Sequence, residues 1–251
     1  MNILLNGANG RMGKEVALAA KNQENMNIIC GFDRDENLTG EFPVYNNIQN
    51  IKENIDVIID FSVPEATFKI LEFAKTNKIP VVIATTGFSE QELEKIKELS
   101  KELPIFRSSN MSLDINLMAS LVQKIAEVLR DSDIEIIETH HNKKIDSPSG
   151  TAILLADAIN EVFENQKEYN FDRMNKREKR EKKEIGFSSI RGGNVVGEHT
   201  VQFFSDNETL EITHKSYSRQ VFAEGALKAA SFIVKQENGL YNILLFNLIA
   251  Y

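Results

Sequence analysis

The N-terminal segment constrains the fold of this chain more than any other. Residues 2–6 form a short apolar run typical of a strand, and residues 14–21 have the spacing of an amphipathic helix. Between them Gly7, Gly10 and Gly13 form a turn with the spacing G-x-x-G-x-x-G. Gly7 can make the tight turn, Gly10 lets the backbone approach a phosphate, and Gly13 lets the helix pack on the strand. The pattern predicts a dinucleotide-binding loop, and the alternative is an ordinary strand–helix turn.

The next strand end supplies a second part of the expected nucleotide site. Residues 26–32 read as a strand that ends at Asp33, which lies 20 residues beyond Gly13. At this distance an acidic side chain can accept a hydrogen bond from the adenosine ribose of NADH. Arg34 follows directly and could instead hold the 2′-phosphate of NADPH. The sequence therefore predicts NADH, NADPH or both as cofactor, against the simpler interpretation of a surface Asp–Arg pair.

Strands and helices alternate through the first hundred residues. The expected strands cover 56–61, 80–84 and 104–107, and the expected helices 64–76 and 89–100. Ser89 and Glu92 have the spacing of a capping box at the start of the last of these helices. The order predicts an α/β fold with a Rossmann-like, doubly wound parallel sheet. Residues 84–87 and 108–111 then fall at the carboxyl ends of strands, where such sheets bind cofactors, although their threonines and serines could be plain caps and turns.

The pattern changes after Asn110. The expected helices are 114–129 and 149–163, and the expected strands are 133–139, 185–191, 199–204 and 209–214. A helical pattern returns from Arg219. We therefore expect a dinucleotide-binding domain of residues 1–110 and 219–251, with residues 239–251 packed against it. Residues 111–218 are expected to form an α+β domain with an open mixed sheet, and so large an exposed sheet predicts self-association.

The candidate catalytic segment runs from Glu138 to Thr151 and reads E-T-H-H-N-K-K-I-D-S-P-S-G-T. It places His140, His141 and Lys144 just ahead of a Ser-Gly-Thr that opens an apolar helix. The unpaired amides of a helix start attract carboxylates, while histidine and lysine supply protons and positive charge. These residues predict a small anionic substrate that is protonated during the reaction.

Other residues of the segment have simpler interpretations. Asp146 and Pro148 are expected to be structural, as a turn acceptor and a lead into the helix. One of the two adjacent histidines could be a structural hydrogen-bonding group. No metal site is predicted, because neighbouring side chains on an extended chain point to opposite sides and only His199 and His214 remain as further histidines.

Composition narrows the function classes. The net charge is −8, which argues against nucleic acid as a partner. Residues 176–184 combine six basic with three acidic side chains and are expected to be a solvated loop or helix face. The single cysteine, Cys30, lies in an apolar strand and is expected to fill the core in a reducing compartment. With neither a signal peptide nor an apolar run of membrane-spanning length, we expect a cytoplasmic location and no membrane.

Taken together, these motifs resemble the dihydrodipicolinate reductase (4-hydroxy-tetrahydrodipicolinate reductase) family of bacterial lysine and diaminopimelate biosynthesis. The matching segments are residues 7–13, 60–64, 84–88, 108–112, 138–151 and 191–199. The block with the histidines and Lys144 is specific, whereas the glycine loop alone is not. Two departures are Asn142 and Lys143, where relatives often carry Arg and His, and Asp33 in place of the longer Glu.

The resemblance implies specific roles and partners. It implies reduction of 4-hydroxy-tetrahydrodipicolinate, dehydrated first, by NADH or NADPH, and a homotetramer joined through the second domain's sheets. Proton donation is implied for His140 and Lys144. Contacts with the dicarboxylate substrate are implied for His141, Lys144, Ser149, Gly150 and Thr151. Cofactor contacts are implied for Gly7, Ala8, Asn9, Gly10, Arg11, Met12, Asp33, Arg34, Ala84, Thr85, Thr86, Ser108, Ser109, Asn110 and Met111.

Two other functions stay open at this point. One is another NAD(P)-linked enzyme of similar layout, such as an amino-acid dehydrogenase, against which the cluster of Lys144 with Ser149, Gly150 and Thr151 speaks. The other is a non-catalytic, nucleotide-sensing regulator, which would not need His140 or Lys144.

Overall fold

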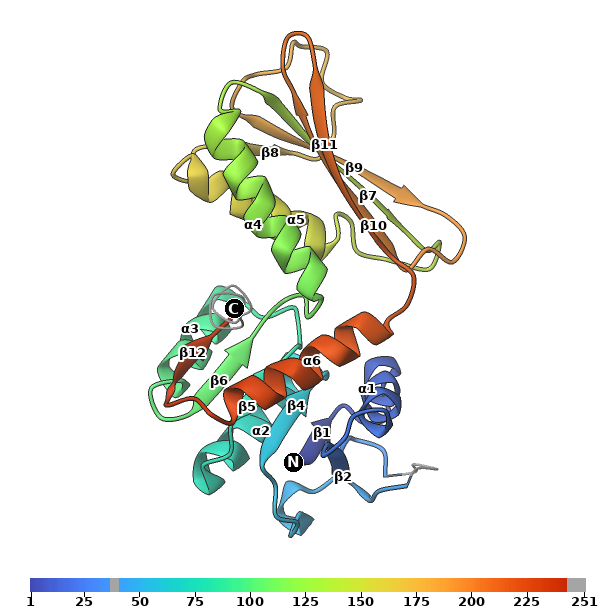
Figure 1. Ribbon diagram of the computed structural model, residues 1–251, viewed down its shortest axis with the longest axis vertical. Coiled ribbons are helices and arrows are strands. Elements are labelled where there is room, and N and C mark those ends of the chain that lie inside the picture. The colour runs from blue at the N-terminus through green and yellow to red at the C-terminus, as the bar shows by residue number, and fades with distance from the viewer. Residues whose placement is uncertain (37–40, 243–251) are drawn as a thin grey trace. The chain divides into compact units, whose positions relative to one another are not determined.

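The computed structural model describes residues 1–36 and 41–242 and divides the chain into two compact units (Figure 1). The first unit comprises Met1–Met111 and the chain from Arg219 onward, and the second comprises Ser112–Ser218. A parallel sheet flanked by helices forms the first unit, and a mixed sheet with two helices forms the second. The predicted fold class is confirmed.

The first unit is built on a seven-stranded sheet of order β12-β6-β5-β4-β1-β2-β3, in which every neighbouring pair is parallel. Its strands are β1 Asn2–Asn6, β2 Asn27–Phe32, β3 Val44–Tyr45, β4 Val57–Asp60, β5 Val81–Ile83, β6 Pro104–Arg107 and β12 Gly239–Tyr241. Its helices are α1 Arg11–Lys21, α2 Pro64–Asn77, α3 Glu90–Leu99 and α6 Gln220–Ile233, with a 3₁₀ turn, η1, at Ile48–Asn50. The β12 strand pairs with β6 in this unit, and residues 243–251 lie outside the described residues.

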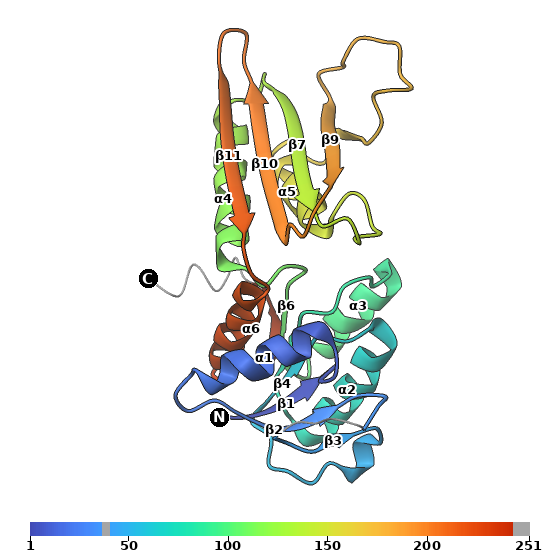
Figure 2. The same cartoon turned by 90° about the vertical axis from the view of Figure 1, so that its right-hand side faces the viewer.

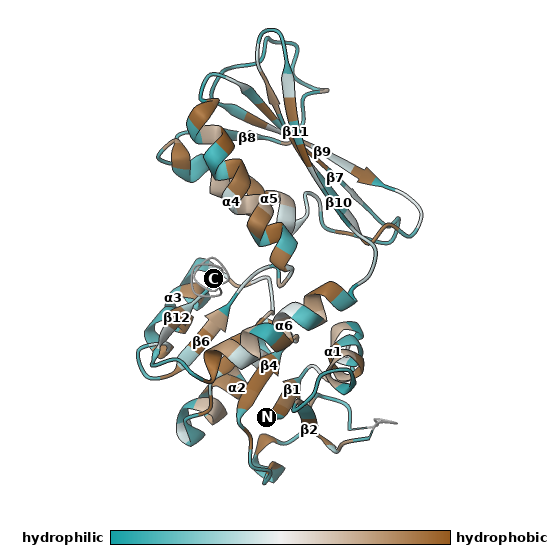
Figure 3. Ribbon diagram, viewed as in Figure 1, coloured by the Kyte–Doolittle hydropathy of each residue, from teal (hydrophilic) through white to brown (hydrophobic). Residues whose placement is uncertain are grey.

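Helices cover both faces of this sheet, which explains the continuously apolar strands (Figure 2). Ile3 and Leu5 point into a core shared with α1 and α6, while Leu4 between them points into a core shared with α2 and α3. The strands of the sheet are correspondingly hydrophobic in Figure 3. Cys30 is buried in the second of these cores, as expected, and burial raises the pKa of its thiol to about 12. The predicted capping box of Ser89 and Glu92 opens α3.

The second unit has a five-stranded mixed sheet of order β11-β10-β7-β9-β8. Its strands are β7 Asp133–His140, β8 Glu168–Asn170, β9 Glu184–Arg191, β10 Gly197–Phe204 and β11 Thr209–Ser216, and its helices are α4 Leu113–Val128 and α5 Gly150–Val162. The β9 strand runs parallel to β7 and β8, whereas β10 is antiparallel to β7 and β11. Both helices lie on the same side of the sheet (Figure 2).

Alternation along β7 decides which of its side chains reach the helix-covered face. Ile134 and Ile136 belong to the core formed with α4 and α5, and Glu138 and His140 continue the same buried row. The other face carries polar side chains. The charge run between β8 and β9 is a largely exposed loop, as expected, except that Arg180 and Glu184 near its end turn inward.

Candidate active site

The glycine turn joins the carboxyl end of β1 to α1. Gly7 has a φ of +78°, and a Cβ atom there would lie 2.9 Å from the carbonyl carbon of Phe61. Gly13 is equally confined, because its Cβ would lie 2.6 Å from the carbonyl oxygen of Ala8. Gly10 is the N-cap of α1, and the first turn of this helix contains no acidic residue. The amides at the start of α1 therefore suit an anion such as a pyrophosphate.

Asp33 anchors the glycine turn. Its carboxylate accepts a hydrogen bond of 2.9 Å from the backbone N–H of Asn9, and the side-chain amide of Asn9 donates to the carbonyl of Asp35. Asp33 directly follows β2, and Arg34 beside it is exposed. The cofactor contacts expected of these two residues stay a prediction, and the structure adds that Asp33 holds the glycine turn.

A buried acid, Asp60, ties neighbouring strand ends together and was missed as a functional group from the sequence. Its carboxylate accepts from Asn6 Nδ2 at 2.7 Å, Ser62 Oγ at 2.5 Å, Thr67 Oγ1 at 2.6 Å and Thr85 Oγ1 at 2.9 Å. Burial raises the pKa of Asp60, and these hydrogen bonds oppose that rise. The hydroxyl of Thr85, a predicted cofactor contact, is therefore turned into the protein.

The two other predicted cofactor segments divide into exposed and buried residues. Thr86 and Ser109 are exposed at the ends of β5 and β6. Ser108 is buried, and its hydroxyl donates to the carbonyl of Asn110 at 2.6 Å. Met111 is 2% exposed and belongs to the core. Backbone groups and the exposed side chains are thus the parts of these segments that can meet a cofactor.

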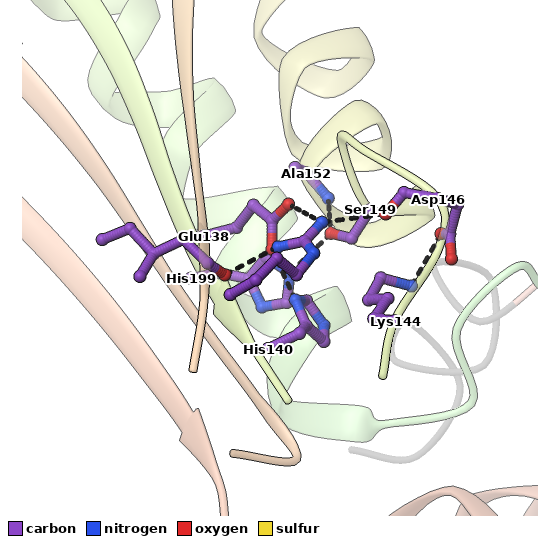
Figure 4. A network of polar contacts seen from close by, with 9 residues as sticks. Glu138, His140, Lys144, Asp146, Ser149, Ala152 and His199 are labelled. Carbon is purple, nitrogen blue, oxygen red and sulfur yellow. Dashed lines mark hydrogen bonds and ion pairs between the residues drawn. The ribbon is translucent and has the colours of Figure 1, made fainter. Parts of the chain in front are cut away.

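In the second unit, the polar row at the end of β7 meets residues of two neighbouring strands (Figure 4). His199 of β10 lies opposite Glu138, and Arg191 of β9 lies opposite His140. Arg191 binds the carboxylate of Glu138 with both terminal nitrogens, at 2.7 and 2.9 Å. His140 Nδ1 bonds to the same carboxylate. A carboxylate only accepts, so Nδ1 carries the proton and Nε2 is the nitrogen left for other partners.

Glu138 is the buried anion of this cluster, with 1% of its surface exposed. Burial alone would raise its pKa, but hydrogen bonds from His140, Arg191 and Ser189 hold the pKa of Glu138 well below its usual range. Glu138 and Arg191 belong to the matching sequence motifs, but the sequence alone indicated no task for either of them. One signal was available in the sequence. Glu138 and His140 are two residues apart on an expected strand, and such residues share a face, so their side chains were expected to be neighbours.

His199 connects this cluster to the start of α5. Its Nε2 is 2.9 Å from Ser149 Oγ, and its ring meets that of His140 edge to face with centroids 5.2 Å apart. Burial, followed by the charge of His140, lowers the pKa of His199 to about 3, so this ring is neutral. Ser149 also accepts from the amide of Ala152 as the N-cap of α5. Ser149 is 2% exposed, and its hydroxyl is engaged by Ala152 and His199; the substrate contact implied for it stays a prediction.

Lys144 lies in the loop between β7 and α5. Its Nζ donates to Asp146 Oδ2 at 2.6 Å, and the carbonyl of Asp146 accepts from Arg191 at 2.8 Å. Burial opposes the shift, but the bond from Lys144 leaves the pKa of Asp146 lowered. Asp146, expected to be a turn acceptor, is thus an ion-pair partner. Lys144 is itself mostly buried, with 18% of its side chain exposed.

The remaining predicted substrate residues surround the helix start. His141 is half-buried, and its carbonyl accepts from the amide of Lys144 at 3.1 Å. Gly150 and Thr151 are the first residues of α5, whose first turn contains no acidic residue. No atom lies within 4 Å of a Cβ built on Gly150. Lys144 thus lies in the loop that leads into α5, and the amides of Gly150 and Thr151 open that helix. Their contact with a substrate carboxylate stays a prediction.

Acid should weaken the second unit through Glu138. The pKa of Glu138 in the folded state lies below the ordinary value of 4.5, so the folded state binds fewer protons than the unfolded state. The Glu138 carboxylate therefore stabilises the fold fully at pH values above about 4.5. This contribution is lost as the pH falls. In urea unfolding between pH 6 and pH 3, Glu138→Gln should be less stable at pH 6, and the gap to the parent should narrow below pH 4.5. Glu127→Gln, at an exposed ion pair on α4, is the control. A gap that stays constant with pH would contradict this prediction.

Within the described residues, no group of three or more histidine, cysteine or acidic side chains is arranged to hold a metal ion. None of the helices in the same part of the chain has the length and apolarity that a membrane crossing needs.

Comparisons with known proteins agree with this geometry. Residues 1–111 match the family model "Dihydrodipicolinate reductase, N-terminus", and residues 114–245 match "Dihydrodipicolinate reductase, C-terminus". A 4-hydroxy-tetrahydrodipicolinate reductase of Caldanaerobacter subterraneus subsp. tengcongensis is 49% identical over 97% of this chain and 96% of its own length. The enzyme of that name from Clostridium novyi is 43% identical over 96% of each chain.

Solved structures support the same assignment. Dipicolinate-bound dihydrodipicolinate reductase from Paenisporosarcina sp. TG-14 has a TM-score of 0.77 and 26% identity, and the match covers 96% of this chain and 97% of that one. Aspartate dehydrogenase from Thermotoga maritima shares the fold alone, with a TM-score of 0.55, 14% identity, and coverage of 94% and 97%. With both family models matched and full-length relatives at this level of identity, the chain belongs to the dihydrodipicolinate reductase family.

Proposed function

We propose that this protein reduces 4-hydroxy-tetrahydrodipicolinate, by way of dihydrodipicolinate, to tetrahydrodipicolinate in lysine and diaminopimelate biosynthesis, with NADH or NADPH as reductant. The observation that carries the proposal is the assembly of His140, Lys144 and the start of α5 around one loop of the second unit. A dicarboxylate that must gain a proton needs this combination of cationic and acidic groups. The relative from Paenisporosarcina was solved with dipicolinate, itself a dicarboxylate.

In this proposal the first unit binds the dinucleotide, with domain boundaries of 1–110 and 219–251. The glycine turn fits a pyrophosphate, since Cβ atoms at Gly7 and Gly13 would fill the space that the backbone needs. Asp33 and Arg34 hold the adenosine ribose, and the strand ends after β5 and β6 hold the nicotinamide half. When bound, the reduced nicotinamide supplies the hydride.

The proposed substrate-binding domain, residues 111–218, corresponds to the second unit within one residue. The ammonium of Lys144 and the amides of Gly150 and Thr151 hold one carboxylate, with His141 as a further contact. His140 has its Nδ1 proton committed to Glu138, so any proton it gives to the substrate leaves from Nε2. His140 and Lys144 are the proton donors that complete the reduction, and Ser149 acts by capping the helix that presents these amides.

A coupled assay tests the proposal. The substrate is generated in situ by the synthase that precedes this step, and oxidation of NADH and of NADPH is followed at 340 nm. Oxidation that depends on the synthase and its substrates supports the reductase. Oxidation driven instead by the reverse reaction of an amino-acid dehydrogenase, with ammonia and a keto acid, would support the first rival. Nucleotide binding without any turnover, unaffected by loss of His140 and Lys144, would support the regulator.

Nucleotide selectivity should depend on Arg34. Asp33 accepts from a ribose hydroxyl but repels a 2′-phosphate, and Arg34 can offset this repulsion by a charge-assisted bond. We expect the parent protein to bind both nucleotides. Arg34→Ala should weaken NADPH binding about tenfold, in line with an exposed charged hydrogen bond, and change NADH binding by less than about twofold. Calorimetric titration of both nucleotides is the measurement, and an equal loss for both would show that Arg34 does not meet the 2′-phosphate.

Two further parts of the proposal concern assembly and location. No helix among the described residues covers the outer face of the second sheet, where Ile190 and Phe204 are 50% and 38% exposed among polar side chains. We assign this face to a homotetramer, because an open sheet of this size favours self-association. Light scattering after gel filtration should give four times the 28.4 kDa of one chain, and a mass of one chain would contradict it. A cytoplasmic location follows from the need for reduced nicotinamide nucleotides.

A further inference from the structure

A line of hydrogen bonds and ion pairs joins the two proposed proton donors. It runs from His140 to the carboxylate of Glu138, then to the guanidinium of Arg191, and through Asp146 to the ammonium of Lys144. Arg191 is the centre of this line. It binds Glu138 on β7 and, at 2.8 Å each, the carbonyls of Asp146 in the loop and of Ile190.

The burial of its central pair distinguishes this arrangement from an ordinary surface network. The side chains of Glu138 and Arg191 are 1% and 21% exposed. Their contact is bidentate, a geometry in which a planar guanidinium fixes the orientation of a carboxylate as well as its charge. The bond to Glu138 raises the pKa of Arg191, so both members stay charged. Contacts from two strands and one loop hold this buried pair, so the Glu138 carboxylate has a single orientation. His140 is hydrogen-bonded to that carboxylate.

We propose that Glu138 and Arg191 are positioning residues for proton transfer. Glu138 holds the His140 ring in the tautomer with the proton on Nδ1, which directs Nε2 to the substrate. Arg191 holds Glu138 in place and, through the Asp146 carbonyl, holds the loop that carries Lys144. This inference rests on the proposed function in assigning proton donation to His140 and Lys144. Neither positioning residue is required to touch the substrate.

Other groups around His140 do not supply the same effect. His199 from β10 faces the ring edge to face at 5.2 Å and is neutral, with a pKa of about 3. Gly197 at the start of β10 lies against the ring, since a Cβ there would be 3.1 Å from His140 Nε2. The charges facing this cluster are Glu138 from its own strand, Arg191 from β9, and Lys144 with Asp146 from the loop. Within the described part of the chain, Glu138 is the residue that accepts a bond from the ring.

The test uses Glu138→Gln and Arg191→Lys, with a matched control pair formed by Glu135 of β7 and Arg180 of the loop before β9. Glu135 lies three residues earlier on β7 and is paired with Arg180, which also donates to two backbone carbonyls, at 2.8 and 2.9 Å. Glu135→Gln and Arg180→Lys therefore remove the same kinds of bond away from His140. Nitrogen-15 NMR of the histidine rings identifies which ring nitrogen is protonated. The chain has four histidines, and His140→Gln assigns the signal.

The expected result has three parts. The parent protein shows His140 protonated on Nδ1 at neutral pH, and Glu138→Gln shows a mixture of tautomers. Turnover falls by about 10²- to 10⁴-fold in Glu138→Gln, the upper end being the loss found when the acid that orients a catalytic histidine is replaced by its amide, while KM for the substrate changes by less than about threefold. Arg191→Lys lowers turnover and raises KM, since the Lys144 loop is also released. The controls change neither turnover nor tautomer.

Two outcomes would overturn the inference. One is an unchanged His140 tautomer in Glu138→Gln, and the other is a loss of turnover no larger than in Glu135→Gln. The NMR result does not depend on the identity of the substrate, so it still tests the positioning of His140 if the parent protein proves inactive in the coupled assay. Thermal unfolding of all four variants shows whether a loss of turnover comes from a loss of folded protein.

Discussion

Replacing Lys144 or His140 by alanine should lower turnover by about 10²- to 10⁴-fold, the usual range for a general acid, and leave nucleotide binding within about twofold. Both residues belong to the second unit, whereas the glycine turn and Asp33 belong to the first. Lys144→Ala should in addition raise KM, because the same ammonium holds a substrate carboxylate in the proposed site. His140→Ala should act mainly on turnover, because its ring is committed to proton transfer.

The measurement is steady-state kinetics in the coupled assay, together with calorimetric titration of NADH and NADPH. Lys124→Ala is the matched control, since it removes a lysine that forms an ion pair of 3.0 Å on α4 of the same unit. A variant of Lys144 or His140 that keeps near-normal turnover would refute the role assigned to that residue. Equal losses of turnover and nucleotide affinity would place the substituted residue in the nucleotide site instead.

The local part of the site could be predicted from sequence because its signals are local. Ser149 before an apolar run indicates a helix start, and α5 begins at the next residue. The same signal also predicts that the Ser149 hydroxyl accepts a hydrogen bond from the helix as its N-cap. An N-cap serine accepts from an amide of the first turn, as Ser149 does from Ala152, and Ser149 also meets His199, 50 residues away.

The part that sequence could not reveal depends on strand register. Glu138 and Arg191 are 53 residues apart, and their contact exists because β9 pairs with β7 in the register that sets Arg191 beside His140. Nothing in either segment alone specifies that register. Asp60 was missed for a similar reason, because its hydrogen-bond donors come from β1, α2 and the segments after β4 and β5.

Short strands without an apolar pattern were also missed. The β3 strand has only two residues, and β8 has three, and both are held by parallel pairing with a longer neighbour rather than by their own sequence. The alternating strands and helices of the first unit were visible because central strands such as β4 and β5 are buried on both faces and are therefore largely apolar. Such runs predict the sheet but not the contacts at its edge.

Gly13→Ala should reduce the affinity for both nucleotides roughly 10- to 100-fold, the cost of overpacking a closely packed contact. Alanine ordinarily stabilises a helix by about 1 kcal/mol relative to glycine. Helix propensity alone would therefore predict a more stable α1 in Gly13→Ala and no loss of nucleotide affinity. At Gly13 the added methyl would meet the carbonyl oxygens of Gly7 and Ala8, both in the turn that precedes α1. The turn must then move, and the amides that hold the pyrophosphate move with it.

A graded comparison separates this steric effect from a general weakening of the first unit. At Gly10 the nearest atom to an added Cβ is the carbonyl oxygen of Gly7 at 3.1 Å, which calls for a shift of only a few tenths of an ångström. Gly10→Ala should therefore weaken nucleotide binding less than Gly13→Ala, although Gly10 is as close to the start of α1. Titration of NADH and NADPH against both variants, with circular dichroism to confirm folding, gives the order. If Gly10→Ala proved the more damaging, direct approach of the phosphates to Gly10 would limit binding more than packing at Gly13 does.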